Sequence, residues 1–211
     1  MIMKFIKLGF SLLFIYLAKS NAVAQIAFKA DSDFVFYSDS LDKFAHITLP
    51  DFNNVDLEMR FYSISLSNHQ SLLYLFQHKK TGEWMLKQMQ FCSRDMIAFT
   101  NFKEHSINLG LNWNKIWQRL LKNNILSLPT EGKVFKKWQS SRNIMPIIGD
   151  GLYYRVELLS EHGNRRYRYS NPEAKIQFLD RNNQELKDIN EIIEILNNEF
   201  DIKSKNKEDC Q

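Results

Sequence analysis

The five histidines are the first residues to consider for metal binding or acid-base catalysis. They are His46, His69, His78, His105 and His162. No two of them have the close spacing that a local zinc site uses. Several would have to converge in space before they could hold a metal ion. The simpler interpretation is that each histidine is either exposed or hydrogen-bonded within the fold. No metal or other cofactor is expected.

Serine chemistry has similarly little support in the sequence. Three serines between residues 63 and 67 precede His69, but no Gly-x-Ser-x-Gly turn is present to expose a nucleophile. A catalytic triad is recognised by geometry and not by proximity along the chain. A hydrolase that uses His78 or His162 with Glu157, in a cleft between two halves of the chain, is therefore the alternative hypothesis. Its substrate would be an envelope glycan or peptide.

The most suggestive constellation lies in a hairpin expected between residues 152 and 170. Tyrosine and arginine are enriched at binding hot spots because they combine a large contact area with a polar tip. Such a face could bind a partner protein, a peptide carboxylate or an anionic glycan. The candidate binding residues are Tyr153, Arg155, Glu157, Arg166, Tyr167, Arg168 and Tyr169.

A purely structural interpretation of the same hairpin is also open. Strand alternation places Tyr154, Val156 and Leu158 on one face, and Arg155 with Glu157 on the other. Glu157 can then form a cross-strand ion pair with an arginine of the return strand, either Arg166 or Arg168. The arginines would cover tyrosine rings on a solvated face.

Strands are expected to dominate the first half of the chain. Short runs rich in aromatic and β-branched residues, separated by polar or proline-bearing turns, indicate strands at 34–37, 45–49 and 57–66. A further hairpin is expected over 72–91, where Gly82 can take the positive φ of the turn.

Two helices are expected in the second half. Asn112 is a suitable N-cap for a helix over 113–124, which ends before Leu128-Pro129. Residues 130–149 are the least regular and are expected to form a long loop or an added strand. The last helix is predicted to start at Asp188, with Glu191 completing a capping box. Its apolar stripe consists of Ile189, Ile192, Ile193, Leu196 and Phe200.

This order of elements predicts an α+β fold in which an antiparallel sheet of hairpins packs with two main helices. A single domain is expected over residues 25–202, with possible subdomains at 25–110 and 111–202. The charged residues 203–211 are expected to be a disordered tail.

Several short motifs in the second half recur together in other sequences. The motifs are Trp117-x-x-Leu120, Leu128-Pro129, Asp150-Gly151, Glu157, Arg166-Tyr167-Arg168-Tyr169 and Asn171-Pro172. In this order they resemble a pattern found in uncharacterised bacterial exported proteins. The resemblance covers residues 113 to about 200 and implies the same fold and export, without an activity to carry over.

The first 24 residues have the organisation of a secretory signal peptide. Lys4 and Lys7 precede an apolar run over 8–18, and Ala22-Val23-Ala24 forms a small-x-small cleavage site. The apolar run is about a dozen residues, whereas a transmembrane helix needs roughly 20. An uncleaved anchor or a buried N-terminal helix is the alternative. We expect cleavage after Ala24 and a periplasmic or extracellular mature chain.

Charge and cysteine content follow from this cleavage. Residues 1–24 hold three lysines and no acidic residue, so the net charge of +4 becomes +1 in the mature chain. A nucleic-acid partner is therefore not expected. The favoured hypothesis is a non-enzymatic envelope protein that binds a protein or peptide; its oligomeric state is open.

A disulfide between Cys92 and Cys210 is one possibility for the two cysteines. By closing a long loop it would stabilise the fold by about 4 to 5 kcal/mol. The alternative is a buried Cys92 and a free thiol in the tail.

Overall fold

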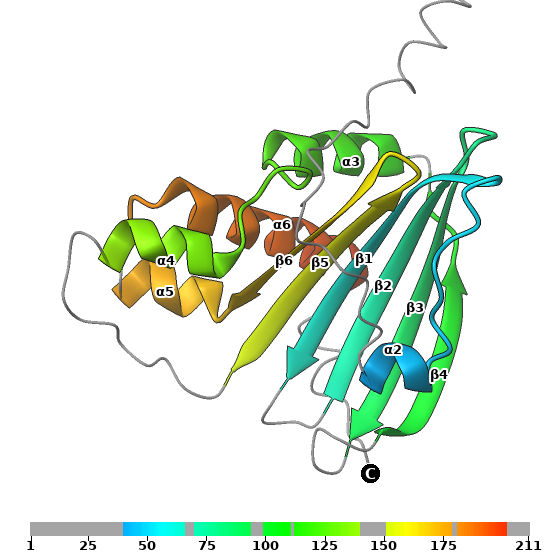
Figure 1. The fold of residues 1–211 in the computed structure, drawn as a ribbon, viewed down its shortest axis with the longest axis horizontal. Coiled ribbons are helices and arrows are strands. Elements are labelled where there is room, and N and C mark those ends of the chain that lie inside the picture. The colour runs from blue at the N-terminus through cyan, green and yellow to red at the C-terminus, as the bar shows by residue number, and fades with distance from the viewer. Residues whose placement is uncertain are drawn as a thin grey trace, which may run out of the picture.

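A six-stranded antiparallel sheet organises the part of the chain that the computed structural model describes, residues 40–65, 70–93, 99–110, 112–139, 151–178 and 181–201. Strand β1 pairs with β5, so strands from both halves of the chain share one sheet (Figure 1). The predicted α+β fold is confirmed. In spatial order the strands are β4 (Phe99–Ile107), β3 (Trp84–Ser93), β2 (Gln70–Lys79), β1 (Val55–Ser65), β5 (Leu152–Ser160) and β6 (Gly163–Ser170).

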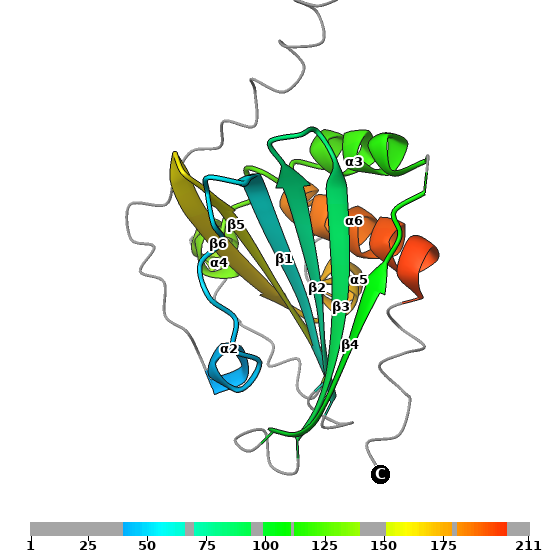
Figure 2. The ribbon, with the colours of Figure 1, turned by 90° about the vertical axis from the view of Figure 1, so that its right-hand side faces the viewer.

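Within the described ranges, four helices cover one face of the sheet, and one short helix lies on the other. Figure 2 shows α2 on the opposite side of the sheet from α3 and α6. Buried side chains of α3, α4 and α6 join the main hydrophobic core. The helices are α2 (Ser40–Phe44), α3 (Trp113–Lys122), α4 (Glu131–Gln139), α5 (Pro172–Phe178) and α6 (Gln184–Phe200).

Alternation along the strands separates the two faces of the sheet. In β1 the odd-numbered Leu57, Met59 and Phe61 are fully buried in the main core beneath the helices. The intervening Glu58 and Arg60 are also buried, but on the other face. In β5 the predicted division holds, since Tyr154, Val156 and Leu158 all belong to the main core. Both faces of the central strands are thus covered, and the face opposite the helices combines buried charged side chains with a second, smaller apolar cluster.

The last helix begins four residues before the predicted start. The side chain of Asn183 caps it by accepting a hydrogen bond from the Leu186 N–H at 2.8 Å. Asp188 lies inside the helix, where its carboxylate accepts hydrogen bonds from Asn124 at 2.7 Å and Gln184 at 2.6 Å. The predicted capping box is therefore wrong, because Asp188 is buried against the end of α3. The apolar stripe from Ile189 to Phe200 is confirmed.

Two further helix predictions need correction. Asn112 has helical backbone angles and makes no capping hydrogen bond through its side chain. Residues 131–139, predicted as a loop or added strand, form α4 instead. Val134 and Phe135 are buried there, and Glu131 accepts a hydrogen bond from the Ser170 N–H of β6 at 3.0 Å. These contacts stabilise a helix that the local sequence, with Gly132 and several lysines, did not indicate.

The strand predictions were mostly right, and both hairpins form. Gly82 has a φ of 88° in the β2–β3 turn, as expected. The β5–β6 loop consists of Glu161 and His162. Residues 45–49 do not form a strand; they cross the face of the sheet without joining it. Strand β4 was not predicted, and residues 34–37 lie outside the described part.

Other sequence predictions concern segments outside the described residues. These include the signal peptide at 1–24 and the tail at 203–211. Cys92, buried near the end of β3, is disulfide-bonded. Cys210 is the only other cysteine in the sequence and lies outside the described residues. Among the described residues, no helix has the length and apolar character needed to cross a membrane.

Candidate functional site

The sheet face opposite α6, called here the open face, holds a cluster of six charged side chains. We define the ion cluster as Asp42, Glu58, Arg60, Arg155, Glu157 and Arg166, which come from α2, β1, β5 and β6. Three carboxylates face three guanidinium groups, so the formal charges cancel. Buried charges are tolerated in this way when each has an opposite partner within contact distance.

Glu157 is at the centre of the ion cluster. Its Oε1 accepts hydrogen bonds from the Arg166 Nε and Nη2 at 2.7 and 2.6 Å, and lies 3.3 Å from the Arg155 Nε. Its Oε2 lies 3.7 Å from the Arg60 Nη1. The predicted cross-strand pair with Arg166 therefore forms, but in a buried setting. Arg168, the other proposed partner, is exposed.

Burial and charge oppose each other in this cluster. Burial raises the pKa of Glu157, while the guanidinium groups of Arg155 and Arg166 lower it. For Arg60 burial favours the neutral form, but the nearby carboxylates of Glu58 and Glu157 outweigh it, so the pKa is raised. Arg60 therefore carries a permanent charge that the surrounding carboxylates balance.

Asp42 attaches α2 to the sheet. Its Oδ1 accepts a hydrogen bond from the Tyr62 hydroxyl at 2.8 Å and lies 3.3 Å from the Arg155 Nη2. The Arg155 guanidinium also stacks 3.6 Å above the centre of the Tyr62 ring. Burial is the main reason that the pKa of Tyr62 is raised, which keeps its hydroxyl available as a donor.

The candidate binding residues of the hairpin divide between the two faces. Arg155, Glu157 and Arg166 come together in the ion cluster, and Tyr153 with Arg168 is exposed. Tyr167 and Tyr169 do not join them, because alternation turns both rings into the core beneath the helices. Their hydroxyls donate to the carbonyls of Ile125 at 2.8 Å and Pro129 at 2.7 Å, and burial raises both pKa values. Grouping these two tyrosines with the arginines was therefore wrong.

Residues 45–51, called here the strap, cross the open face after α2. The Thr48 carbonyl accepts a hydrogen bond from the Arg60 Nη2 at 2.5 Å, which joins the strap to the ion cluster. Ile47 packs into a small apolar cluster with side chains of β2 and β3 such as Leu75 and Met89. Leu49, by contrast, leaves 49% of its surface exposed.

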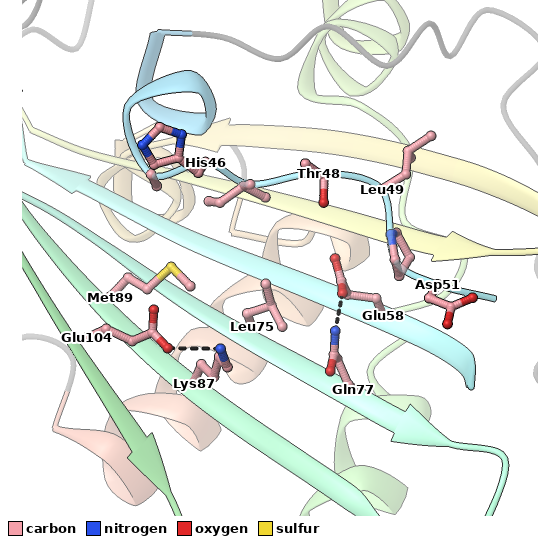
Figure 3. Close-up of a pocket in the computed structure, with 13 residues that line it drawn as sticks. His46, Thr48, Leu49, Asp51, Glu58, Leu75, Gln77, Lys87, Met89 and Glu104 are labelled. Atoms are coloured by element: carbon pink, nitrogen blue, oxygen red, sulfur yellow. Dashed lines mark hydrogen bonds and ion pairs between the residues drawn. The ribbon is translucent and has the colours of Figure 1, made fainter. Parts of the chain in front are cut away.

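A groove of about 320 Å³ lies between the strap and strands β1 to β4. Figure 3 shows two polar pairs on its floor, Glu58 with Gln77 and Lys87 with Glu104, and Leu75 lies between them. The Gln77 amide donates to Glu58 at 2.6 Å, and the Lys87 ammonium lies 2.9 Å from the Glu104 carboxylate. The lining residues are Ala45, His46, Ile47, Thr48, Leu49, Pro50, Asp51, Glu58, Leu75, Gln77, Lys87, Met89 and Glu104.

The catalytic arrangement of the alternative hypothesis is not assembled. His78 lies 3.4 Å from Asp56 and packs against the Trp84 ring, which belongs to the helix side of the sheet. His162 is exposed in the β5–β6 turn, and Glu157 is buried on the open face. Burial lowers the pKa of His78, although Asp56 opposes this effect. No group of three potential metal ligands occurs among the described residues.

Sequence reasoning missed the β1 contribution to this site. Glu58, Arg60 and Tyr62 alternate with apolar residues in a strand whose two neighbours are also strongly apolar. That alternation was visible in the sequence and indicates a polar face. The contact between Tyr62 of β1 and Asp42 of α2 could not be predicted, because these two segments meet only through the tertiary fold.

The chain has no detected relative among known proteins. No family model, no curated protein and no solved structure matches the chain. The resemblance of residues 113 to 200 to bacterial exported proteins therefore stays a prediction.

Proposed function

We propose that the protein is exported and binds a protein or peptide partner through the groove on its open face. The groove between the strap and β1 to β4 is the observation that carries this proposal. It is open to solvent and combines polar side chains with the apolar Leu75 and Met89. This mixture suits a peptide, which presents backbone amides together with side chains of both kinds.

The composition of the groove favours a peptide over a glycan. Sugar rings are commonly bound against aromatic faces, and none of the described lining residues is a tryptophan, tyrosine or phenylalanine. Of the ion cluster only Glu58 lines the groove, and the cluster as a whole holds α2 and the strap against the sheet. Within the hairpin first considered for binding, Tyr153 and Arg168 remain accessible at one side of this face.

Export is a separate part of the proposal and depends on residues 1–24. A basic start, a short apolar run and Ala22-Val23-Ala24 suit signal peptidase cleavage before Gln25. The partner would then be a protein or peptide of the periplasm or the extracellular space. An envelope location is also where a disulfide at Cys92 would persist.

Photocrosslinking in cells that make the protein naturally tests both parts. A photoreactive phenylalanine derivative replaces Leu49 in the strap, and a matched variant carries it at Glu199, an exposed residue of α6. We expect a discrete adduct from Leu49 in the envelope or medium fraction and none from Glu199. The captured protein is identified by mass spectrometry and its binding is repeated with purified components. Equal adducts at both sites, or none at Leu49, would reject the groove.

A further inference from the structure

The strap contains a strand-like sequence that has no strand partner among the described residues. Residues 45–49, Ala-His-Ile-Thr-Leu, have the β-branched character that favours a strand. In the structure they pair with none of the six strands of the sheet. A segment with strand propensity and no ladder can accept an extended chain beside it.

The backbone hydrogen bonds of the strap indicate which groups are available. The Thr48 carbonyl is already used by Arg60, and the Ile47 N–H donates to the Asp42 carbonyl at 2.8 Å. Neither the N–H nor the C=O of Leu49 has a backbone hydrogen-bond partner within the described part of the chain.

The charge of the groove selects the kind of peptide. Its lining holds three carboxylates, from Asp51, Glu58 and Glu104, and one ammonium, from Lys87, so the formal charge is −2 with His46 neutral. Glu58 is already compensated by Arg60 behind it. Asp51 stays ionised because hydrogen bonds, first from the Asn53 N–H, lower its pKa. Glu104 is the accessible acid on the floor, with 37% of its side chain exposed.

We propose that an extended peptide segment with a basic side chain binds by strand addition to Leu49 of the strap, and that its lysine or arginine pairs with Glu104. This inference rests on the proposed function and specifies its ligand. The peptide backbone supplies the missing partners of the Leu49 N–H and C=O. Its basic side chain competes with Lys87 for the Glu104 carboxylate across the groove floor.

Selection from a displayed library of random dodecapeptides on the purified mature protein tests the inference. We expect enriched peptides to carry lysine or arginine, and a synthetic copy to bind about tenfold more weakly to Glu104→Gln, since a charge-assisted hydrogen bond is lost. Lys87→Gln should bind at least as tightly as the unaltered protein, because a competitor for Glu104 is removed. Glu199→Gln, on the opposite face, should bind unchanged. Enrichment of acidic peptides, or no enrichment, would overturn the inference.

A second measurement isolates the backbone part of the proposal. Bound peptide should slow hydrogen exchange at the Leu49 amide. N-methylation is then introduced at either the odd or the even positions of the peptide, and only the set whose N–H groups face the strap should weaken binding, by about tenfold. Exchange at Leu49 that does not change on binding would overturn strand addition.

The two proposals can fail separately. A partner crosslinked at Leu49 in cells, together with selected peptides that are acidic or insensitive to N-methylation, would retain the function and reject the basic strand. The opposite result is basic peptides that bind at Leu49 but no crosslinked partner in cells. It would support binding of a basic strand to the strap and reject the proposal that a natural partner binds in the groove.

Discussion

Arg60 of β1 and Glu157 of β5 are register partners, and their side chains meet in a site from which solvent is excluded. The Arg60 Nη1 lies 3.7 Å from the Glu157 Oε2, and both side chains have 0% exposure. Arg60 also contacts Glu58 and the Thr48 carbonyl, so one guanidinium links two strands and the strap. The groove wall therefore depends on a charge buried in the sheet.

Loss of Arg60 should be costly. Arg60→Met leaves Glu58 and Glu157 buried without this cation, and we expect the free energy of unfolding to fall by about 3 to 5 kcal/mol. Urea denaturation followed by circular dichroism measures the change. Arg168→Met, which removes an exposed arginine of the neighbouring hairpin, should change stability by less than about 0.5 kcal/mol.

A second substitution should recover part of that loss. Adding Glu157→Gln to Arg60→Met removes a carboxylate for which burial already favours the neutral form. The double variant should be more stable than Arg60→Met alone. Strict additivity of the two effects would show that Arg60 and Glu157 do not interact.

The hydroxyl of Tyr62 should determine how firmly α2 is held. Tyr62→Phe removes the 2.8 Å hydrogen bond to Asp42 but keeps the ring beneath Arg155. We expect a loss of about 1 to 2 kcal/mol and faster hydrogen exchange in residues 40–48, with smaller changes in β1. Tyr153→Phe, at an exposed tyrosine, is the control. Identical exchange in both variants would contradict this anchoring role.

Stability should decrease on acidification through His78. Burial holds its pKa in the folded state below that in the unfolded chain, so the unfolded chain takes up the proton first as the pH falls below about 6.5. The stabilisation is full above that pH and is lost as the pH falls through the folded-state pKa. Each unit of difference between the two pKa values is worth about 1.4 kcal/mol.

Unfolding measured between pH 7.5 and 5 would check the role of His78. His78→Asn should flatten the profile. His105→Asn, which removes an exposed imidazole of β4, serves as the comparison. A flattening of equal size in both variants would mean that burial of His78 is not its source.

The mature chain should begin at Gln25. N-terminal sequencing of protein recovered from the envelope or medium tests this expectation directly. Ala22→Phe with Ala24→Phe places bulky residues in the small-x-small site and should block cleavage, so that a longer precursor accumulates. Recovery of the uncut chain from the cytoplasm, without these substitutions, would exclude export.

Exported protein should contain no free thiol. Cys92 is disulfide-bonded and Cys210 is the only other cysteine, so alkylation under denaturing conditions should add no label unless a reductant is present. Cys210→Ala should then expose a reactive Cys92 and lower stability by up to about 4 to 5 kcal/mol. Labelling of both cysteines in unreduced exported protein would refute the bridge.

Much of the core was predictable because it depends on local periodicity. The alternation of Tyr154, Val156 and Leu158 placed β5 correctly, and the stripe from Ile189 to Phe200 identified the buried face of α6. Strand β4 was missed because its solvent-exposed run from Lys103 to Ser106 gives no apolar alternation. An edge strand needs polar residues, which remove the signal used to find it.

The candidate site was less predictable because its contacts are distant in the sequence. Asp42 meets Tyr62 across 20 residues and Arg155 across 113. The local pattern predicted a strand over residues 45–49, whereas contacts such as the hydrogen bond from Arg60 to the Thr48 carbonyl hold these residues across the sheet. Tyr167 and Tyr169 were misplaced for a different reason. Their polar tips resemble binding residues, but two backbone carbonyls satisfy them inside the core.

The pairing of β1 with β5 has a consequence for the order of folding. Strands β1 to β4 form from hairpins between neighbours in the sequence, and so does the β5–β6 hairpin. Joining β1 to β5 requires closure of a long loop, which is slow compared with local hairpin formation. Until then β1 has an unpaired edge beside Leu57, Met59 and Phe61, and this edge can pair with other chains. We therefore expect the newly synthesised chain to aggregate most readily during this interval, and a holding chaperone should improve its yield.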